Sequence, residues 1–317
     1  MSLPDVTEQE ANSLAASAQQ EDRGATLQEG RSVLSTIVIL FKLRVVFLLV
    51  VAATGGAFLA AGSWPGWRVL LLTWITGGLA AAGASALNQY WERRSDASMG
   101  RTSQRPLVTG EIRDPRWVPV VGLLLIFIPS LAVLPFNPAL TFFLLAGAFI
   151  YVVIYTIWLK PRTLLNVVIG GLAGSAAVLS GSAAAGLWNA PGALLLALVL
   201  FFWSPFHFWS LALIYRDEYA KADFPMLPAR TTARSAARWI MAHPLPTIAG
   251  GLFLATLPFL GWFYIVPVFL ISADLFWRAV KLIGDPSPHH ARSVFISSNI
   301  YLLVLLVAVC VGTLIPF

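Results

Sequence analysis

The sequence contains almost none of the residues that build disulfide or thiolate sites, because Cys310 is its single cysteine. One cysteine excludes an internal disulfide framework and a cluster of thiolate ligands. Charge is also scarce, since Asp, Glu, Lys and Arg make up 11% of the 317 residues. Soluble domains carry about 25% charged residues. The chain therefore has too little charge to cover a surface that faces water.

Apolar residues are abundant instead, at 58% of the chain, and they gather in long runs. A helix needs about 20 apolar residues in a row to cross a bilayer. Runs of this kind lie at 36–62, 69–88, 117–135, 139–158, 166–187, 191–213, 237–257, 260–280 and 294–315. We expect an all-α integral membrane protein, a bundle of about nine transmembrane helices, with eight as the alternative count. Long runs with little strand alternation argue against an outer-membrane barrel.

The N-terminal 33 residues are polar, acidic and rich in Ala, Gln and Glu. They lack the apolar core of a secretory signal and the arginine content of an organelle transit peptide. We predict a disordered cytoplasmic tail over residues 1–35 and a transmembrane domain over residues 36–317.

The net charge of +6 is distributed unevenly along the chain. If the N-terminus lies inside, the inner segments are 1–44, 89–116, 159–163, 215–238 and 278–293. These segments hold 20 of the 21 Lys and Arg residues, and only Arg68 lies outside. Basic residues concentrate in cytoplasmic loops, so the pattern predicts a cytoplasmic N-terminus and a C-terminus on the outer side. The basic excess thus indicates topology, and nucleic acid is not an expected partner.

The inner loop after the second apolar run is too rich in polar residues for a simple connector, and reads NQYWERRSDASMGRTSQRPLVTGEIRDPR. Asn88, Glu92 and Asp96 are four residues apart and fall on one face of a helix. Their oxygens suit Mg²⁺, which prefers carboxylates and substrate phosphate oxygens. Arg101 and Arg105 follow, and guanidinium groups pair well with phosphate. The pattern favours a diphosphate site, and the alternative is a solvated, salt-bridged loop.

A second acidic cluster follows the sixth apolar run, where Asp217 and Glu218 leave the membrane and Asp223 stands further along. If one helix runs through the cluster, His207 shares a face with Glu218 and lies about 16 Å deeper. An ionisable residue at that depth is a functional candidate. The alternative is a neutral histidine that bonds a neighbouring helix.

Four further polar residues stand at the inner ends of other apolar runs: Lys42, Arg44, Lys160 and Asn166. Each alone is typical of an interfacial anchor, but together they would surround a polyanion from several helices. Aromatic residues that could line an apolar pocket and stabilise a cation through their π-faces are Tyr151, Tyr155, Trp158, Trp203, Phe206, Phe208 and Trp209. The alternative for these is the aromatic belt found at membrane interfaces.

Several motifs together resemble a known family. The pattern N-x-x-x-[DE]-x-x-x-D followed by A-x-M-x-R-T-x-x-R-P-L is carried by Asn88, Glu92, Asp96, Ala97, Met99, Arg101, Thr102, Arg105, Pro106 and Leu107. Residues 155–166 read YTIWLKPRTLLN. A later motif comprises His207, Phe208, Trp209, Asp217, Glu218, Tyr219, Pro225, Met226, Leu227 and Pro228. The stretch ARSVFISSNIYL follows near the end. From about residue 40 to 310 the chain resembles the UbiA superfamily of membrane prenyltransferases, and within it the branch that farnesylates heme.

The resemblance implies an inner-facing active-site cavity and roles for its residues. Mg²⁺ as cofactor would be held by Asn88, Glu92, Asp96, Asp217 and Glu218. The diphosphate of farnesyl diphosphate would be bound by Arg101, Arg105, Lys160, Lys42 and Arg44. The pocket for heme b and the prenyl chain would be lined by His207, Trp209, Tyr155, Asn166 and Tyr219. Catalysis is assigned to the metal-binding residues with Lys160. Two departures from the family pattern are Leu43, where proline is usual, and Asp223, where glycine is usual.

The implied reaction transfers farnesyl to a vinyl carbon of heme b with addition of water, in the inner membrane of a bacterium. Membrane lipid surrounds such a protein, and heme A synthase or terminal oxidase assembly lies downstream. Three alternatives stay open. Prenyl transfer to an aromatic quinone precursor would use the same fold. A transporter would need polar residues through the midplane, and a structural assembly factor would need none of the spaced acids.

Overall fold

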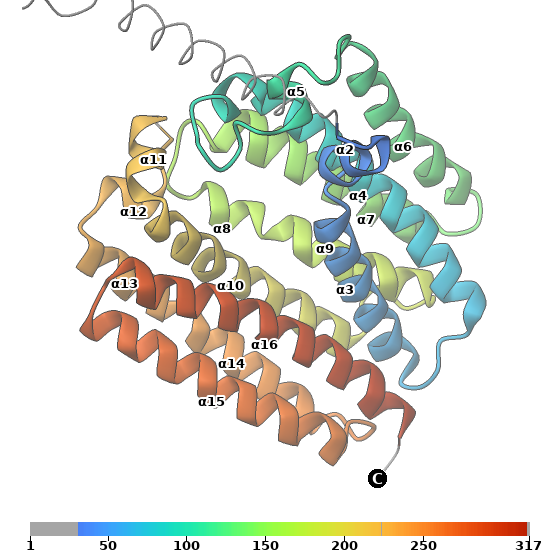
Figure 1. Cartoon of the computed structure of the whole chain (residues 1–317). Helices are drawn as coiled ribbons and strands as arrows, with labels where there is room; N and C mark the ends of the chain where they lie inside the picture. The colour runs from blue at the N-terminus through green and yellow to red at the C-terminus, as the bar shows by residue number, and fades with distance from the viewer. Residues whose placement is uncertain (1–30, 223, 316–317) are drawn as a thin grey trace, which may run out of the picture. The chain divides into compact units, whose positions relative to one another are not determined.

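The computed structural model describes residues 31–222 and 224–315, and within them every regular element is helical (Figure 1). The predicted all-α class is confirmed. The predicted tail lies almost wholly outside the described residues, as does Asp223. Residues 31–37, which include the start of α2 (Val33–Leu40), belong to a separate unit, and the fold below is that of the described residues from 38 onwards.

Seven helical segments are long and apolar enough to cross a membrane. They are α3 (Leu43–Ala61), α4 (Trp67–Asp96), α7 (Pro138–Phe149) with the π-helix η1 (Ile150–Leu159), α8 (Asn166–Gly170) with α9 (Leu172–Ala184), α10 (Pro191–Ile214), α15 (Trp262–Gly284) and α16 (Pro288–Leu314). The predicted run at 117–135 forms the shorter helix α6 (Trp117–Val133).

The predicted run at 237–257 is divided among α13 (Ala233–Ala242), α14 (Pro244–Phe253) and the short 3₁₀-helix η2 (Leu254–Thr256). Pro244 explains the first division, because proline lacks the N–H that continues a helix and fixes its own φ. The remaining short helices, α5 (Pro106–Thr109), α11 (Arg216–Lys221) and α12 (Leu227–Arg230), lie in the polar loops.

The long helices pack side by side with small residues at the closest approaches. α3 packs on α4, α9 and α16, while α10 packs on α9, α14 and α16 (Figure 1). A Cβ on Gly56 would overlap the carbonyl oxygen of Val178, and a Cβ on Gly181 would overlap that of Ala53. Small residues allow the backbones of membrane helices to approach, so these glycines set the α3–α9 spacing.

Gly181→Ala is expected to lower the stability of the protein by roughly 1–3 kcal/mol, the usual cost of overpacking. The control is Gly174→Ala in the same helix, whose added Cβ would make an ordinary contact with Leu200 at 3.8 Å. Thermal unfolding in detergent measures the difference. Equal midpoints for the two variants would contradict the close-packing argument.

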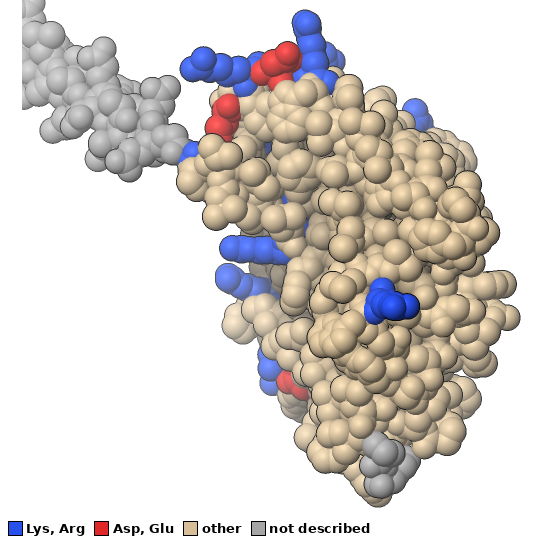
Figure 2. Space-filling view, turned by 90° about the vertical axis from the view of Figure 1, so that its right-hand side faces the viewer, with Lys and Arg blue, Asp and Glu red and all other residues tan. Residues whose placement is uncertain are grey.

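The outer surface is apolar over wide areas. Large exposed side chains on the helices include Phe127, Phe142, Phe253, Trp262 and Phe269. Figure 2 shows a broad face of uncharged residues, with most of the Lys, Arg, Asp and Glu side chains in view gathered along its margin. An apolar surface of this extent is favourable in contact with lipid and unfavourable in contact with water. The protein is therefore a multi-pass membrane protein.

Candidate active site

The first predicted motif lies on one buried face of α4. This helix runs on to Asp96, so Asn88, Glu92 and Asp96 are stacked at successive turns, as the spacing predicts. Their exposed fractions are 2%, 6% and 5%. Burying carboxylates is costly unless cations or hydrogen bonds compensate them, so each must have a partner.

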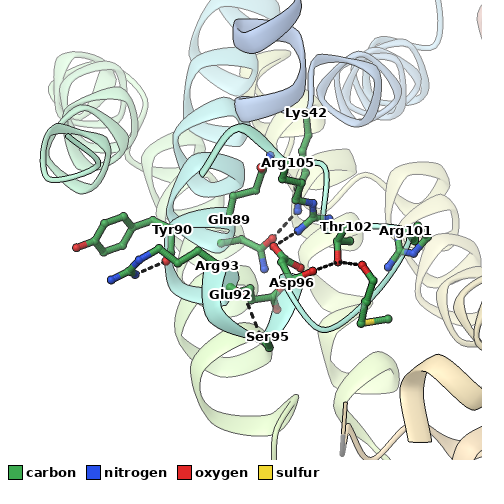
Figure 3. Close-up of polar contacts among 12 residues, drawn as sticks. Lys42, Gln89, Tyr90, Glu92, Arg93, Ser95, Asp96, Arg101, Thr102 and Arg105 are labelled. Carbon is green, nitrogen blue, oxygen red and sulfur yellow. Dashed lines mark hydrogen bonds and ion pairs between the residues drawn. The ribbon is translucent and has the colours of Figure 1, made fainter. Parts of the chain in front are cut away.

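Each of the three has a cationic neighbour outside α4, and Figure 3 shows Arg105 beside Asp96. Lys160 Nζ lies 2.5 Å from Glu92 Oε1, and Arg105 Nη1 lies 2.5 Å from Asp96 Oδ2. The ammonium of Lys42 donates a hydrogen bond to Asn88 Oδ1. The carboxylates predicted to bind metal are thus paired with cations predicted to bind diphosphate.

Lys42 reaches the site because the chain turns sharply between α2 and α3. Its backbone is left-handed, with φ of 49°. Gln89 Nε2 holds the end of α2 by donating to the carbonyls of Ile39 at 2.5 Å and Leu40 at 2.9 Å. Burial of its ammonium, reinforced by nearby Arg105, lowers the pKa of Lys42 to about 7. A bound anion would favour its charged form.

Lys160 directly follows the π-helix η1, and the wider turn of this helix determines the position of Lys160. The amide of Lys160 donates to the carbonyl of Tyr155, five residues earlier, at 2.8 Å. Thr156 in the same helix accepts a 2.9 Å hydrogen bond from Asn88 Nδ2. Burial favours the neutral amine, but the Glu92 carboxylate outweighs it and raises the pKa of Lys160 above its usual value. Lys160 is therefore positively charged beside Glu92, and π-helices recur at functional sites.

The loop after α4 brings the second acidic motif towards the first. The amide of Arg101 lies 3.5 Å from Glu218 Oε2, and its guanidinium donates to the Tyr219 hydroxyl at 3.3 Å. Asp217 is exposed. Neighbouring residues of a helix point in different directions, so α11 brings Glu218 to the loop and leaves Asp217 at the surface. Residues 31–222 and 224–315 contain no group of three or more Asp, Glu, His or Cys close enough to hold a metal by themselves.

A cavity of about 450 Å³ opens among α3, α4, α7, η1, α9, α10 and α16. Its walls are mostly apolar, and polar groups enter it at a few places. Arg101 lines it, as do His207 and the predicted aromatics Tyr151, Tyr155, Trp203 and Phe208. The rings of Tyr151 and Tyr155 are stacked, with centroids 5.8 Å apart. The cavity joins an apolar interior to one of the predicted diphosphate-binding residues.

Other predicted pocket residues lie elsewhere. Trp209 is two residues from His207, on the opposite side of α10, and its ring meets His243 edge-on at 5.0 Å. Asn166 is fully buried and donates to the carbonyls of Thr163 and Pro225, which ties α8 to the loop before α12. Tyr219 contacts Arg101 and does not line the cavity.

Four further expectations meet a different geometry. Arg44 is exposed on α3. Trp158 is exposed, and Phe206 is fully buried away from the cavity. The alignment of His207 with Glu218 ends early, because α10 stops at Ile214 and the backbone bends before α11.

Some residues that build the site escaped the sequence reasoning. Thr156 accepts a hydrogen bond from Asn88, and Gln89 holds the chain just before Lys42. Ser298 and Phe295 of α16 both contact His207. All four stand inside or beside the quoted motifs. Their motif positions are the signal that could have identified them, although spacing alone does not reveal contacts between helices.

Comparison with known proteins places this geometry in a family. The UbiA prenyltransferase family matches residues 48–310. Protoheme IX farnesyltransferase 2 of Paramagnetospirillum magneticum is 38% identical over 289 residues, covering 89% of this chain and 98% of that protein. Protoheme IX farnesyltransferase of Metallosphaera sedula is 37% identical over 276 residues, covering 87% and 95%.

Two solved structures share the fold. A digeranylgeranylglyceryl phosphate synthase structure has a TM-score of 0.73 at 15% identity and covers 88% of this chain and 98% of that one. A UbiA homolog from Archaeoglobus fulgidus, bound to DMAPP and Mg²⁺, has a TM-score of 0.59 at 16% identity and covers 87% and 99%. The chain belongs to the UbiA prenyltransferase family.

Proposed function

We propose that this protein transfers the farnesyl group of farnesyl diphosphate to a vinyl group of heme b and adds water, which gives heme O. The observation that supports heme b as the acceptor is the 38% identity to a protoheme IX farnesyltransferase over 89% of the chain. The fold supports prenyl transfer in general, and this identity selects the heme branch.

The polar end of the site has the composition that a metal diphosphate needs. Asn88, Glu92 and Asp96 offer only oxygen ligands, which suits Mg²⁺, and Glu218 adds a further carboxylate beside the loop. A bound Mg²⁺ would stabilise negative charge on the leaving diphosphate. The present cation–carboxylate pairs keep the buried charges compensated before substrate arrives.

The basic residues then act on the leaving group. When the bond between farnesyl C1 and the diphosphate oxygen breaks, the bonding electrons stay with diphosphate. Lys160, Arg105 and Arg101 supply positive charge where that negative charge grows, and fixed charges in a dry site stabilise it strongly. Lys160 and Arg105 would exchange their carboxylate partners for phosphate oxygens without leaving an unpaired charge if a bound metal were held by Glu92 and Asp96.

The apolar cavity protects the allylic cation that remains. Water exclusion prevents premature hydrolysis, and the stacked rings of Tyr151 and Tyr155 present π-faces to positive charge. Farnesyl C1 bonds to the terminal vinyl carbon of heme. The positive charge moves to the carbon next to the porphyrin ring, which takes up water and releases a proton.

The uneven charge of the chain supports an orientation in which the polar end of the site faces the cytoplasm. We place the protein in a bacterial inner membrane with nine crossings, the N-terminus inside and the C-terminus outside. The product would pass to heme A synthase or to terminal oxidase assembly.

The test is incubation of the purified protein with farnesyl diphosphate, Mg²⁺ and heme b, followed by mass spectrometry of the extracted heme. The expected product is heavier than heme b by the mass of one farnesol. A parallel reaction offers 4-hydroxybenzoate as acceptor. Prenylation of the aromatic acid with unchanged heme would reject the heme assignment in favour of the quinone branch.

A further inference from the structure

His207 is held between two aromatic rings. Its ring is stacked between Trp203 of the same helix and Phe295 of α16, with centroids 4.2 Å and 4.6 Å away and interplanar angles of 17° and 25°. The residue is 8% exposed. Two aromatic faces fix the ring plane, so only the ring edge is left for chemistry.

Hydrogen bonds on α16 determine which ring nitrogen carries the hydrogen. His207 Nδ1 lies 2.8 Å from Ser298 Oγ, and Ser298 Oγ lies 2.7 Å from the carbonyl oxygen of Phe295. A serine hydroxyl has one hydrogen, and a carbonyl can only accept. Both bonds form together only if Ser298 donates to Phe295 and Nδ1–H donates to Ser298. Nε2 then carries a lone pair.

The same clamp is anchored at a second point. Trp203 Nε1 donates a 2.8 Å hydrogen bond to the carbonyl of Ser298, so the stacking ring and the acceptor of Nδ1–H are tied to one residue. Phe295 in turn contributes both the other stacking face and the carbonyl that takes the Ser298 hydrogen. Neither the plane nor the tautomer of His207 can change without breaking this network.

The free edge of the ring opens into the apolar cavity. His207 lines the cavity, and Nε2 is not among the buried polar atoms that are closed off without a partner. The other described lining residues with side-chain nitrogen are Arg101, Trp203 and Asn299, whose nitrogens are donors. Among the described lining residues, His207 is therefore the one whose side-chain nitrogen offers a free lone pair.

We propose that Nε2 of His207 coordinates the iron of the heme acceptor and so sets the plane and position of the porphyrin in the cavity. Ser298 is a positioning residue, because a metal-bound histidine keeps its orientation and basicity through the hydrogen bond made by its other nitrogen. The proposal rests on the heme acceptor of the proposed function. It explains why one imidazole, fixed in its orientation, stands in a mostly apolar cavity.

The experiment uses the purified full-length protein with heme b and reads the iron ligand by absorption, electron paramagnetic resonance and the ferrous iron–histidine stretch. The wild type is expected to show a histidine-ligated heme. His207→Ala should lose that signature and regain it with added imidazole, and His207→Met should shift it to a thioether-ligated spectrum. Ser298→Ala should keep the histidine ligand but weaken heme binding by about 10–100-fold.

The matched control is His289→Ala, which removes an exposed histidine of α16 and should leave the spectrum unchanged. Size-exclusion profiles and circular dichroism exclude unfolding of each variant. A histidine-ligated spectrum in folded His207→Ala or His207→Met without added imidazole would overturn the iron assignment while the proposed function stands. Absence of heme binding by the wild type, with turnover of an aromatic acid, would overturn both.

Discussion

Glu92→Gln and Asp96→Asn are each expected to lower kcat at least about a thousandfold, because metal-assisted charge stabilisation contributes several kcal/mol to such a step. Each substitution keeps the shape of the side chain and removes its negative charge. The changed atoms lie on the buried face of α4, so solvent cannot supply a substitute ligand. The rate of formation of farnesylated heme, measured by mass spectrometry, gives the result.

Stability must be separated from catalysis in this test, because Glu92→Gln leaves the buried amine of Lys160 without its carboxylate partner. Breaking a buried ion pair costs about 3–5 kcal/mol, whereas removing both partners can be nearly neutral. The double variant Glu92→Gln, Lys160→Met should therefore unfold at a higher temperature than Glu92→Gln alone and remain inactive. Recovery of activity with stability would show that Glu92 only compensates Lys160.

Asp274→Asn is the matched control for these acids. Asp274 also lies in an apolar helix and also pairs with an arginine, Arg278, but it belongs to α15 and bonds Ser297 of α16. Its substitution should leave turnover near normal. Near-normal turnover in both site variants as well would reject the assignment of the α4 oxygens to the reaction.

Local periodicity was enough to predict the first half of the site. The spacing of Asn88, Glu92 and Asp96 requires only that α4 continue past the apolar run, and α4 extends to Asp96. Helical periodicity is a property of neighbouring residues, which sequence contains directly. The apolar runs are predictable for the same reason, since length and hydropathy decide whether a helix can cross a bilayer.

Contacts between distant segments could not be predicted in this way. Lys42 meets Asn88 through a left-handed turn, and Lys160 meets Glu92 at the end of a π-helix. Both depend on backbone departures that no local pattern in the sequence indicates. The same applies to Asp217 and Glu218, because the bend before α11 decides which of the two faces the Arg101 loop.

Removing divalent metal is expected to stop turnover and to weaken binding of prenyl diphosphate without abolishing it. Lys160, Arg105 and Arg101 remain to attract the anion, but Lys160 and Arg105 are paired with Glu92 and Asp96 once no metal is present to hold these carboxylates. The measurement compares product formation with and without a chelator, and then after addition of Mg²⁺, Mn²⁺ or Ca²⁺. Mg²⁺ should restore turnover, and the larger Ca²⁺, which takes more ligands at longer distances, should restore less.

The metal dependence of Asp96→Asn connects this prediction with the first. If Asp96 is a ligand, the variant should need more Mg²⁺ for its residual rate, whereas Asp274→Asn should follow the wild-type titration. Undiminished turnover of the wild type in chelator would mean that the basic residues alone stabilise the leaving diphosphate. The acids of α4 would then serve only to keep Lys160 and Arg105 charged and in place, which is the role that their 2.5 Å ion pairs already perform in the protein without substrate.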